Sequence, residues 1–114
     1  MSASRTLTTQ EIDQVSSTSP VTTTTTAYTM LSSDRAIVFN AAATTATITL
    51  LSASLHPGRP LRVKTVTTCT LISSTSNVVP ITSTTAGTAI LGATTGAWAE
   101  LISNGSNWIT MAKG

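Results

Sequence analysis

Threonine and serine make up about a third of this chain of 114 residues, and much of the threonine alternates with aliphatic residues. In residues 46–51 this alternation places Ile48 and Leu50 on one face of an extended strand and Thr47 and Thr49 on the other. Threonine is β-branched, so it favours strands over helices, and its hydroxyl can face water. Because 40% of the residues are hydrophobic and only 9% are charged, we expect an ordered, all-β chain.

The length of the chain and the spacing of its strand-like runs predict one β domain that follows a short arm. We assign residues 1–20 to an N-terminal arm and linker and residues 21–114 to the domain. About eight short strands recur roughly every ten residues, which is typical of a single antiparallel β-sandwich or a small β-barrel. No repeat of fixed length is present, which disfavours a solenoid. The expected strands cover residues 21–31, 35–40, 46–51, 61–64, 68–72, 78–82 and 89–91 and a final hairpin.

Turn-forming residues separate the predicted strands. The clearest turn is Asn104-Gly105 in the final hairpin, since both residue types adopt the positive φ angles that a tight turn requires. Asp34 follows two serines and is expected to cap its turn through the local backbone. Gly58 lies in a loop between two prolines and provides a further turn.

The N-terminal arm carries the pattern of a helix start. Thr8 is placed to cap a first turn, with Glu11 as the reciprocal capping residue three positions later. The segment is too short to be a stable helix alone, so we expect an arm that is extended or briefly helical and that requires a partner surface. The candidate docking residues of the arm are Leu7, Thr8, Glu11, Ile12 and Val15.

The sequence offers little catalytic or metal-binding chemistry. His56 is the only histidine and Cys69 the only cysteine, so paired ligands of these types are missing. Asp34 and Glu100 are the only carboxylates in the predicted domain, and nothing in the sequence places them together. No nucleophile elbow and no glycine-rich phosphate loop is present. We therefore expect no enzyme activity, no catalytic residue, no metal and no cofactor, with Cys69 buried as a small hydrophobic side chain.

The charge pattern and hydropathy also exclude two classes of partner. Six cationic residues against four anionic ones give a net charge of +2, and the cations form no cluster, so we expect no nucleic-acid binding. No apolar run reaches the length of a membrane span, and the polar N-terminus does not resemble a signal peptide. We expect synthesis in a cytosol and burial of the weakly charged surface in an oligomer or a larger assembly.

The order of several motifs resembles the β-structured domain of tailed-phage virion proteins, which include capsid decoration (cement) proteins, head fibres and tail-fibre tips. The matching segments are residues 28–34, 36–40, 48–50, 58–64 and 101–108. The resemblance implies a homotrimeric β module that serves assembly or surface recognition and has no catalytic role. It also implies synthesis in a host cytoplasm.

Two functions follow from this resemblance. The short arm without heptads favours a decoration protein that binds the major capsid protein on the outer surface of the capsid. The alternative is a tail-fibre tip that recognises a host-surface glycan. Trp98 and Trp108 could then form a sugar-stacking platform, although both could instead fill the core or the trimer seam. The Thr-x-Thr run at residues 45–49 suggests a third role, an ice-binding surface, which would need regular ranks of threonine.

Overall fold

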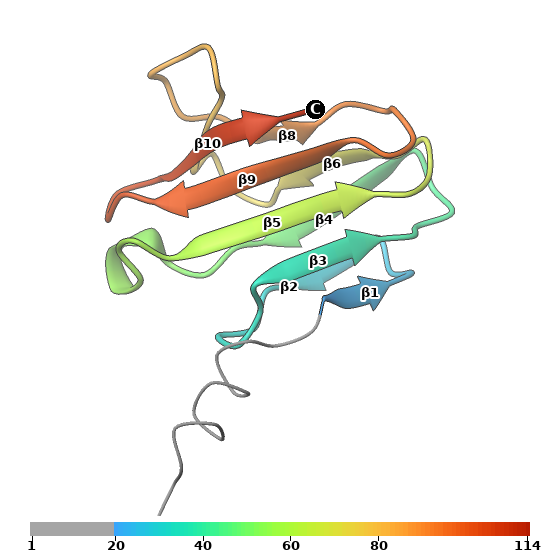
Figure 1. Ribbon diagram of the computed structural model, residues 1–114, viewed down its shortest axis with the longest axis horizontal. Helices are drawn as coiled ribbons and strands as arrows, with labels where there is room; N and C mark the ends of the chain where they lie inside the picture. Colours follow the sequence, from blue (N-terminus) through green and yellow to red (C-terminus); the bar gives the residue numbers. More distant parts are fainter. Residues whose placement is uncertain (1–19) are drawn as a thin grey trace, which may run out of the picture.

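The computed structural model describes residues 20–114, which fold into two β-sheets around one core (Figure 1). The larger sheet has six strands, in the order β1 (Val21–Thr23), β3 (Ala36–Phe39), β5 (Pro60–Thr65), β9 (Trp98–Ser103), β10 (Trp108–Lys113) and β7 (Val78–Val79). The smaller sheet has four strands, in the order β2 (Ala27–Thr29), β4 (Thr45–Thr49), β6 (Thr70–Ser73) and β8 (Ala89–Leu91). A 3-10 helix, η1 (Ala53–Leu55), precedes β5. The all-β prediction is confirmed for the described residues, with ten strands instead of about eight.

The chain winds from one sheet to the other, and this winding contradicts the prediction of an antiparallel fold. Each strand from β1 to β8 lies in the opposite sheet from the strand before it. Because the chain returns to each sheet in the same direction, β1, β3 and β5 are parallel, and so are β2, β4 and β6. Only β9 and β10 form a hairpin, and β9 is also antiparallel to β5. Both sheets are therefore mixed.

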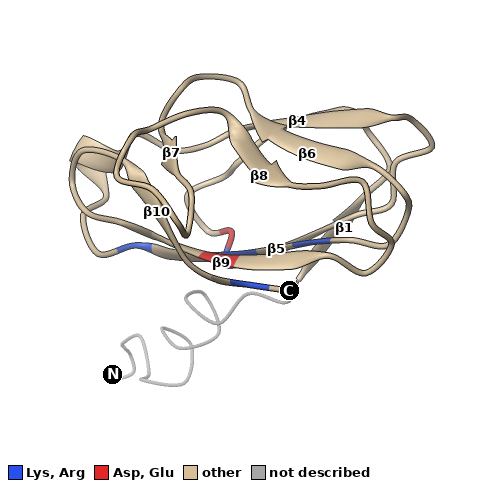
Figure 2. Ribbon diagram, turned by 90° about the horizontal axis from the view of Figure 1, so that it is seen from above, with Lys and Arg blue, Asp and Glu red and all other residues tan. Residues whose placement is uncertain are grey.

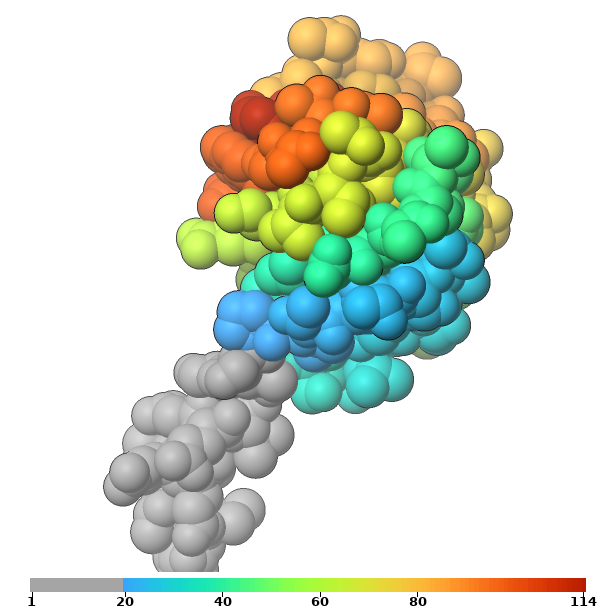
Figure 3. All heavy atoms as spheres, turned by 90° about the vertical axis from the view of Figure 1, so that its right-hand side faces the viewer, coloured from blue at the N-terminus to red at the C-terminus, as the bar shows by residue number. Residues whose placement is uncertain are grey.

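The winding of the chain between the two sheets explains why no repeat is visible in the sequence. Val21, Ile37 and Val63 lie side by side on neighbouring strands, although they are spaced unequally along the chain. Seen from one end, the blue and cyan N-terminal part of the described chain lies at one flank, green and yellow residues lie in the middle, and orange and red residues lie at the other flank (Figure 3). The loops between successive strands differ in length. Strands that lie side by side therefore do not recur at a fixed spacing in the sequence.

Two predicted strands are wrong in detail. Residues 78–82 were expected to form one strand, but only the two residues of β7 do so. Residues 21–31 were expected to form a single strand, but they form β1 and β2, which belong to different sheets. The bend lies at Thr25, whose hydroxyl accepts a hydrogen bond from the backbone N–H of Ala27 at 3.2 Å and donates to its carbonyl at 3.0 Å. Such local side-chain bonds compete with strand pairing, so a run of threonines can contain a corner.

The inner faces of the sheets follow the alternation that the sequence predicts. In β5, Leu61 and Val63 are buried and Arg62 and Lys64 are exposed. Trp108 is the largest fully buried side chain. The core of the described residues is otherwise mainly aliphatic: Ile37, Phe39, Ala46, Ile48, Leu61, Val63, Leu71, Val78, Ile90, Leu91 and Leu101, with Cys69 buried as expected.

The two outer faces differ in charge. In Figure 2 the charged residues of the described chain lie on the six-stranded sheet or in the loops at its end. The outer face of the four-stranded sheet carries threonine together with Ala27, Ile72 and Ala89 and no charged residue. Its threonines do not form complete ranks, because Thr47 lies between Ala27 and Ile72. The regular array that an ice-binding surface would need is therefore missing from this face.

Candidate functional site

The residue types that carry catalysis are dispersed in the part of the chain that the structure describes. Among residues 20–114, no three His, Cys, Asp or Glu side chains lie close enough together to hold a metal ion. The imidazole of His56 lies beside the carbonyl of Ser52, with 3.0 Å between Nδ1 and the oxygen. Asp34 is buried, whereas Glu100 lies on the outer face of the six-stranded sheet. The described residues therefore offer surfaces for binding rather than a cluster of reactive groups.

A shallow groove of about 290 Å³ lies on the outer face of the six-stranded sheet. We call it the Trp98 groove and define it by Pro20 together with Ala36 and Val38 of β3, Arg62 and Lys64 of β5, and Trp98 and Glu100 of β9. The alternation within each strand places these side chains on the same outer face, opposite the buried residues of the core. The short side chains on β3 leave a hollow beside the larger ones on β9.

Trp98 has a neighbour on each side in the sheet. Lys64 on β5 is its cross-strand partner. On the other side, the backbone of Trp98 exchanges two hydrogen bonds with Gly114, at 3.1 and 3.0 Å. A Cβ atom on Gly114 would lie 2.4 Å from the indole Nε1 of Trp98, so only glycine allows the indole to rest against the backbone at this position. Trp98 is 41% exposed, and its indole rests against the backbone of Gly114.

An ion pair lies next to Trp98 in the groove. Arg62 and Glu100 are cross-strand partners, with 3.0 Å between Nε and Oε2. Both side chains are well exposed, so the pair adds little stability but holds a donor and an acceptor in fixed positions. Among the described residues it is the only ion pair, and Lys64 has no carboxylate partner there. The groove consequently carries one uncompensated positive charge.

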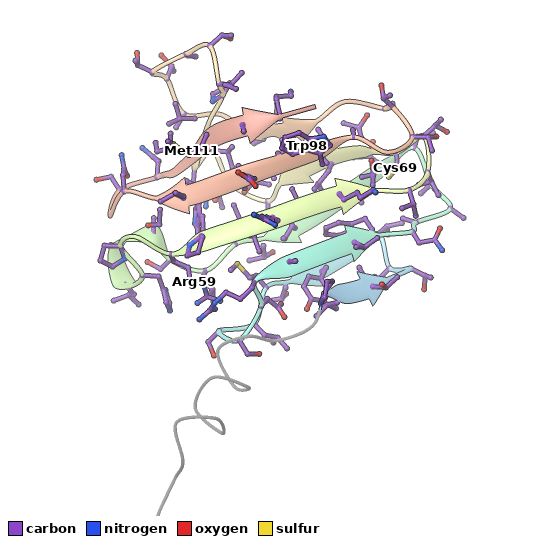
Figure 4. The ribbon with its side chains drawn as sticks, in the orientation of Figure 1. Arg59, Cys69, Trp98 and Met111 are labelled. Atoms are coloured by element: carbon purple, nitrogen blue, oxygen red, sulfur yellow. The ribbon has the colours of Figure 1, made fainter. Side chains whose placement is uncertain are left out.

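The structure does not bring the two tryptophans together as a platform. Trp108 is fully buried, and its indole N–H donates a 2.9 Å hydrogen bond to the carbonyl of Leu51. Trp98 lies on the outer face, as Figure 4 shows. A sugar platform made from both rings is therefore contradicted by their positions on opposite faces of the sheet. Trp108 fills the core, which was the other reading of its role.

The predicted turn residues all lie in loops. Gly58 and Gly105 have φ angles of +78° and +89°, which disfavour any other residue. The side-chain oxygen of Asn104 accepts hydrogen bonds from the backbone N–H groups of Ser106 and Asn107 and so closes the hairpin loop. Asp34 does more than cap its turn, since its Oδ2 accepts from Leu31 N–H at 2.8 Å and from the Tyr28 hydroxyl at 2.7 Å.

A second surface lies at the end of the molecule where β1, β3 and β5 begin. We call it the arm end and define it by Pro20, Leu31, Arg35, Leu55 and Arg59. Leu31 is 57% exposed and Leu55 is 76% exposed, which makes them the two most exposed large hydrophobic residues of the described chain. The Arg35 and Arg59 guanidinium groups both donate to the carbonyl of Asp34. The surface is therefore apolar and basic.

The positive charge at the arm end is only partly compensated. Burial lowers the pKa of Arg59, the charge of Arg35 lowers it further, and Asp34 opposes both effects. The Nε–H of Arg59 is buried and has no hydrogen-bond acceptor within the described structure. A buried donor of this kind normally has a partner. The arm end thus presents one buried hydrogen-bond donor that no described residue satisfies.

The hydroxyl of Tyr28 gives a pH-dependent prediction. Burial, together with the hydrogen bond to Asp34 and the charge of Asp34, raises the pKa of Tyr28 from 10.0 to about 12. Between these pH values the folded protein holds the phenolic proton that the unfolded chain has lost. The free energy of unfolding should therefore fall as the pH rises from 10 to 12, with this contribution fully present below pH 10.

Urea unfolding of the wild type and of Tyr28→Phe between pH 8 and pH 12 measures this contribution. The difference between the two proteins should shrink as the pH rises, because only the wild type can lose the phenolic proton. A constant difference over the whole range would contradict the proposed link between Tyr28 and Asp34. Any other pH-dependent change is shared by the two proteins and cancels in the comparison.

The remaining predicted site residues lie in the arm. Leu7, Thr8, Glu11, Ile12 and Val15 are outside the described residues, as is nearly all of the proposed arm and linker. The sequence predicted a strand at residues 61–64, which contains Arg62 and Lys64, but gave no reason to group these residues with Trp98, Glu100 and Gly114. The missing information was the pairing of β5 with β9.

Comparison with family models, curated proteins and solved structures gave no match. In residues 20–114 we find no helix with the length and apolar character needed to cross a membrane.

Proposed function

We propose that this protein is a non-enzymatic virion structural protein, a capsid decoration protein that binds the major capsid protein on the outer head shell as a homotrimer. The observation that supports this proposal is the arm end. Leu31 and Leu55 are strongly exposed there, beside Arg35 and Arg59. Pro20 lies at the same end, so the segment of residues 1–19 joins the domain beside this surface. Apolar exposure of this kind is typical of a docking surface.

The flanks of the molecule are compatible with a trimer. The edge strands β1 and β2 lie on one flank, and the edge strands β7 and β8 lie on the other. Because the two flanks differ, contact between opposite flanks of neighbouring copies would be head to tail, and a rotation that closes such contacts produces a ring. The low content of charged residues, 9% of the chain, also favours a protein that buries surface in an assembly.

Immunogold electron microscopy of intact virions, with antibody to the recombinant chain, tests the location. Gold over the head supports decoration, whereas gold confined to the tail tip would replace this proposal with receptor recognition. Light scattering at micromolar concentration tests the trimer. A monomer at this concentration would contradict the proposed homotrimer. The second candidate, a tail-fibre tip that binds a host glycan, is favoured by the exposed indole of Trp98.

The docking surface is tested by substitution. The double variant Leu31→Asp/Leu55→Asp should bind decoration-free heads at least ~10-fold more weakly, since loss of two exposed apolar contacts commonly costs a kcal/mol or more. Ile81→Asp is the matched control, because Ile81 is 47% exposed and lies after β7, away from the arm end. Deletion of residues 1–18 should leave the fold intact and abolish binding. Equal weakening by Ile81→Asp would contradict the assignment of the arm end.

A further inference from the structure

We propose that the Trp98 groove binds an acidic saccharide, with a pyranose ring stacked on the Trp98 indole and its carboxylate on Lys64. The inference does not depend on the location of the protein on a head or on a tail. It rests on the placement of four side chains on neighbouring strands: Lys64 and Arg62 on β5, and Trp98 and Glu100 on β9.

The stacking surface is prepared in advance. The backbone of Gly114 lies against the Trp98 indole near Nε1, and the paired hydrogen bonds between the two residues keep it there. In Figure 4 Trp98 projects from the outer face of β9 rather than into the core. An exposed aromatic ring that is already ordered loses little conformational freedom when a ligand stacks on it. The C–H groups of a pyranose ring offer an apolar face for such stacking.

The polar groups of the groove match a sugar better than other ligands. Arg62 presents donors and Glu100 presents acceptors at fixed positions, and hydroxyl groups both donate and accept. A wholly apolar partner would remove water from this ion pair without replacing its hydrogen bonds. The volume of about 290 Å³ is at the lower end of ligand-pocket sizes and suits one or two sugar rings.

Lys64 selects for a negative charge on the sugar. It is the cross-strand neighbour of Trp98, so a ring stacked on the indole has its substituents within reach of the ammonium group. Arg62 is already paired with Glu100, whereas Lys64 has no carboxylate partner among the described residues. A carboxylate on the ligand would give Lys64 a charged partner, which favours an acidic sugar over a neutral one.

The test is a titration of the full chain with trigalacturonate and sialyllactose, followed by NMR of the two indole N–H signals. Maltotriose and lactose are the neutral counterparts. The Trp98 signal should shift saturably with the acidic sugars, whereas the signal of the buried Trp108 should stay in place. Trp98→Phe assigns the signals. No saturable shift of Trp98 with either acidic sugar at millimolar concentration would overturn the proposal, as would equal affinity for acidic and neutral sugars.

Three variants with matched controls identify the groups involved. Trp98→Ala should weaken binding at least ~10-fold, as expected for an aromatic anchor. Lys64→Gln should abolish the preference for acidic sugars, whereas Lys113→Gln, which removes the same charge outside the groove, should not. Gly114→Ala should weaken binding by displacing the indole, and Gly92→Ala, where a Cβ meets no atom within 4 Å, should have no effect. Equal effects of Lys64→Gln and Lys113→Gln would overturn the role of Lys64.

Discussion

Replacement of Trp108 by Ala should lower the free energy of unfolding by about 3–5 kcal/mol, the largest effect expected for any single substitution in this domain. Trp108 is the largest of the fully buried side chains and lies in a core that otherwise holds mainly aliphatic residues. Its truncation leaves a cavity in a closely packed core. It also leaves the carbonyl of Leu51 without the indole N–H that donates to it at 2.9 Å.

Urea unfolding monitored by circular dichroism measures this loss, and Trp98→Ala is the matched control. The same chemical change at Trp98 should cost about 1 kcal/mol, because that side chain is 41% exposed and lies outside the core. The two variants therefore separate stability from binding: Trp108→Ala should unfold easily, and Trp98→Ala should stay folded and lose the ligand. Similar unfolding midpoints for the two variants would contradict the opposite orientations of the indoles.

Asp34→Ala should destabilise the protein by about 2–4 kcal/mol, since it leaves two hydrogen-bond donors without an acceptor. The carboxylate of Asp34 is almost completely buried and accepts from the backbone of Leu31 and from the hydroxyl of Tyr28. These bonds fix the loop between β2 and β3, where the chain passes from one sheet to the other. The same loop contains the carbonyl of Asp34, which accepts a hydrogen bond from the guanidinium group of Arg59.

The control for Asp34 is Glu100→Ala, which removes a carboxylate from an exposed ion pair and should cost about 0–1 kcal/mol. The loss in the free energy of unfolding for Asp34→Asn should lie between those for Asp34→Ala and Glu100→Ala, because the amide keeps one oxygen acceptor. Chemical unfolding of the three variants under the same conditions gives the comparison. If Asp34→Ala were as stable as Glu100→Ala, the turn would not depend on the carboxylate, and the order of the arm end would need another explanation.

Much of the local structure could be predicted because a strand has a period of two residues. The alternation in residues 46–51 gave the correct inner and outer faces of β4, and the strand expected at residues 61–64 lies within β5. The turn at Asn104-Gly105 correctly separated β9 from β10. The split of residues 21–31 into β1 and β2 was missed, since a bend stabilised by the Thr25 hydroxyl leaves no mark on a run of five threonines.

The antiparallel arrangement was wrong for a different reason. Short strands that follow one another closely usually pair as hairpins, and that expectation leads to an antiparallel fold. Here each short connection takes the chain across to the other sheet, so strands that are adjacent in the sequence are not adjacent in a sheet. Neither turn residues nor hydrophobic alternation distinguishes a reversal within a sheet from a crossing between sheets, because both need only a few polar residues.

The sequence by itself determined that the chain is all-β and which side of most strands faces the core, because strand propensity and alternation act over a few neighbouring residues. Only the tertiary structure decided which strands pair. That pairing sets Trp98 between Lys64 and Gly114, places Arg62 beside Glu100, and buries Trp108 against Leu51. Contacts between residues so far apart in the chain depend on the packing of whole strands around one core, and no local pattern encodes them.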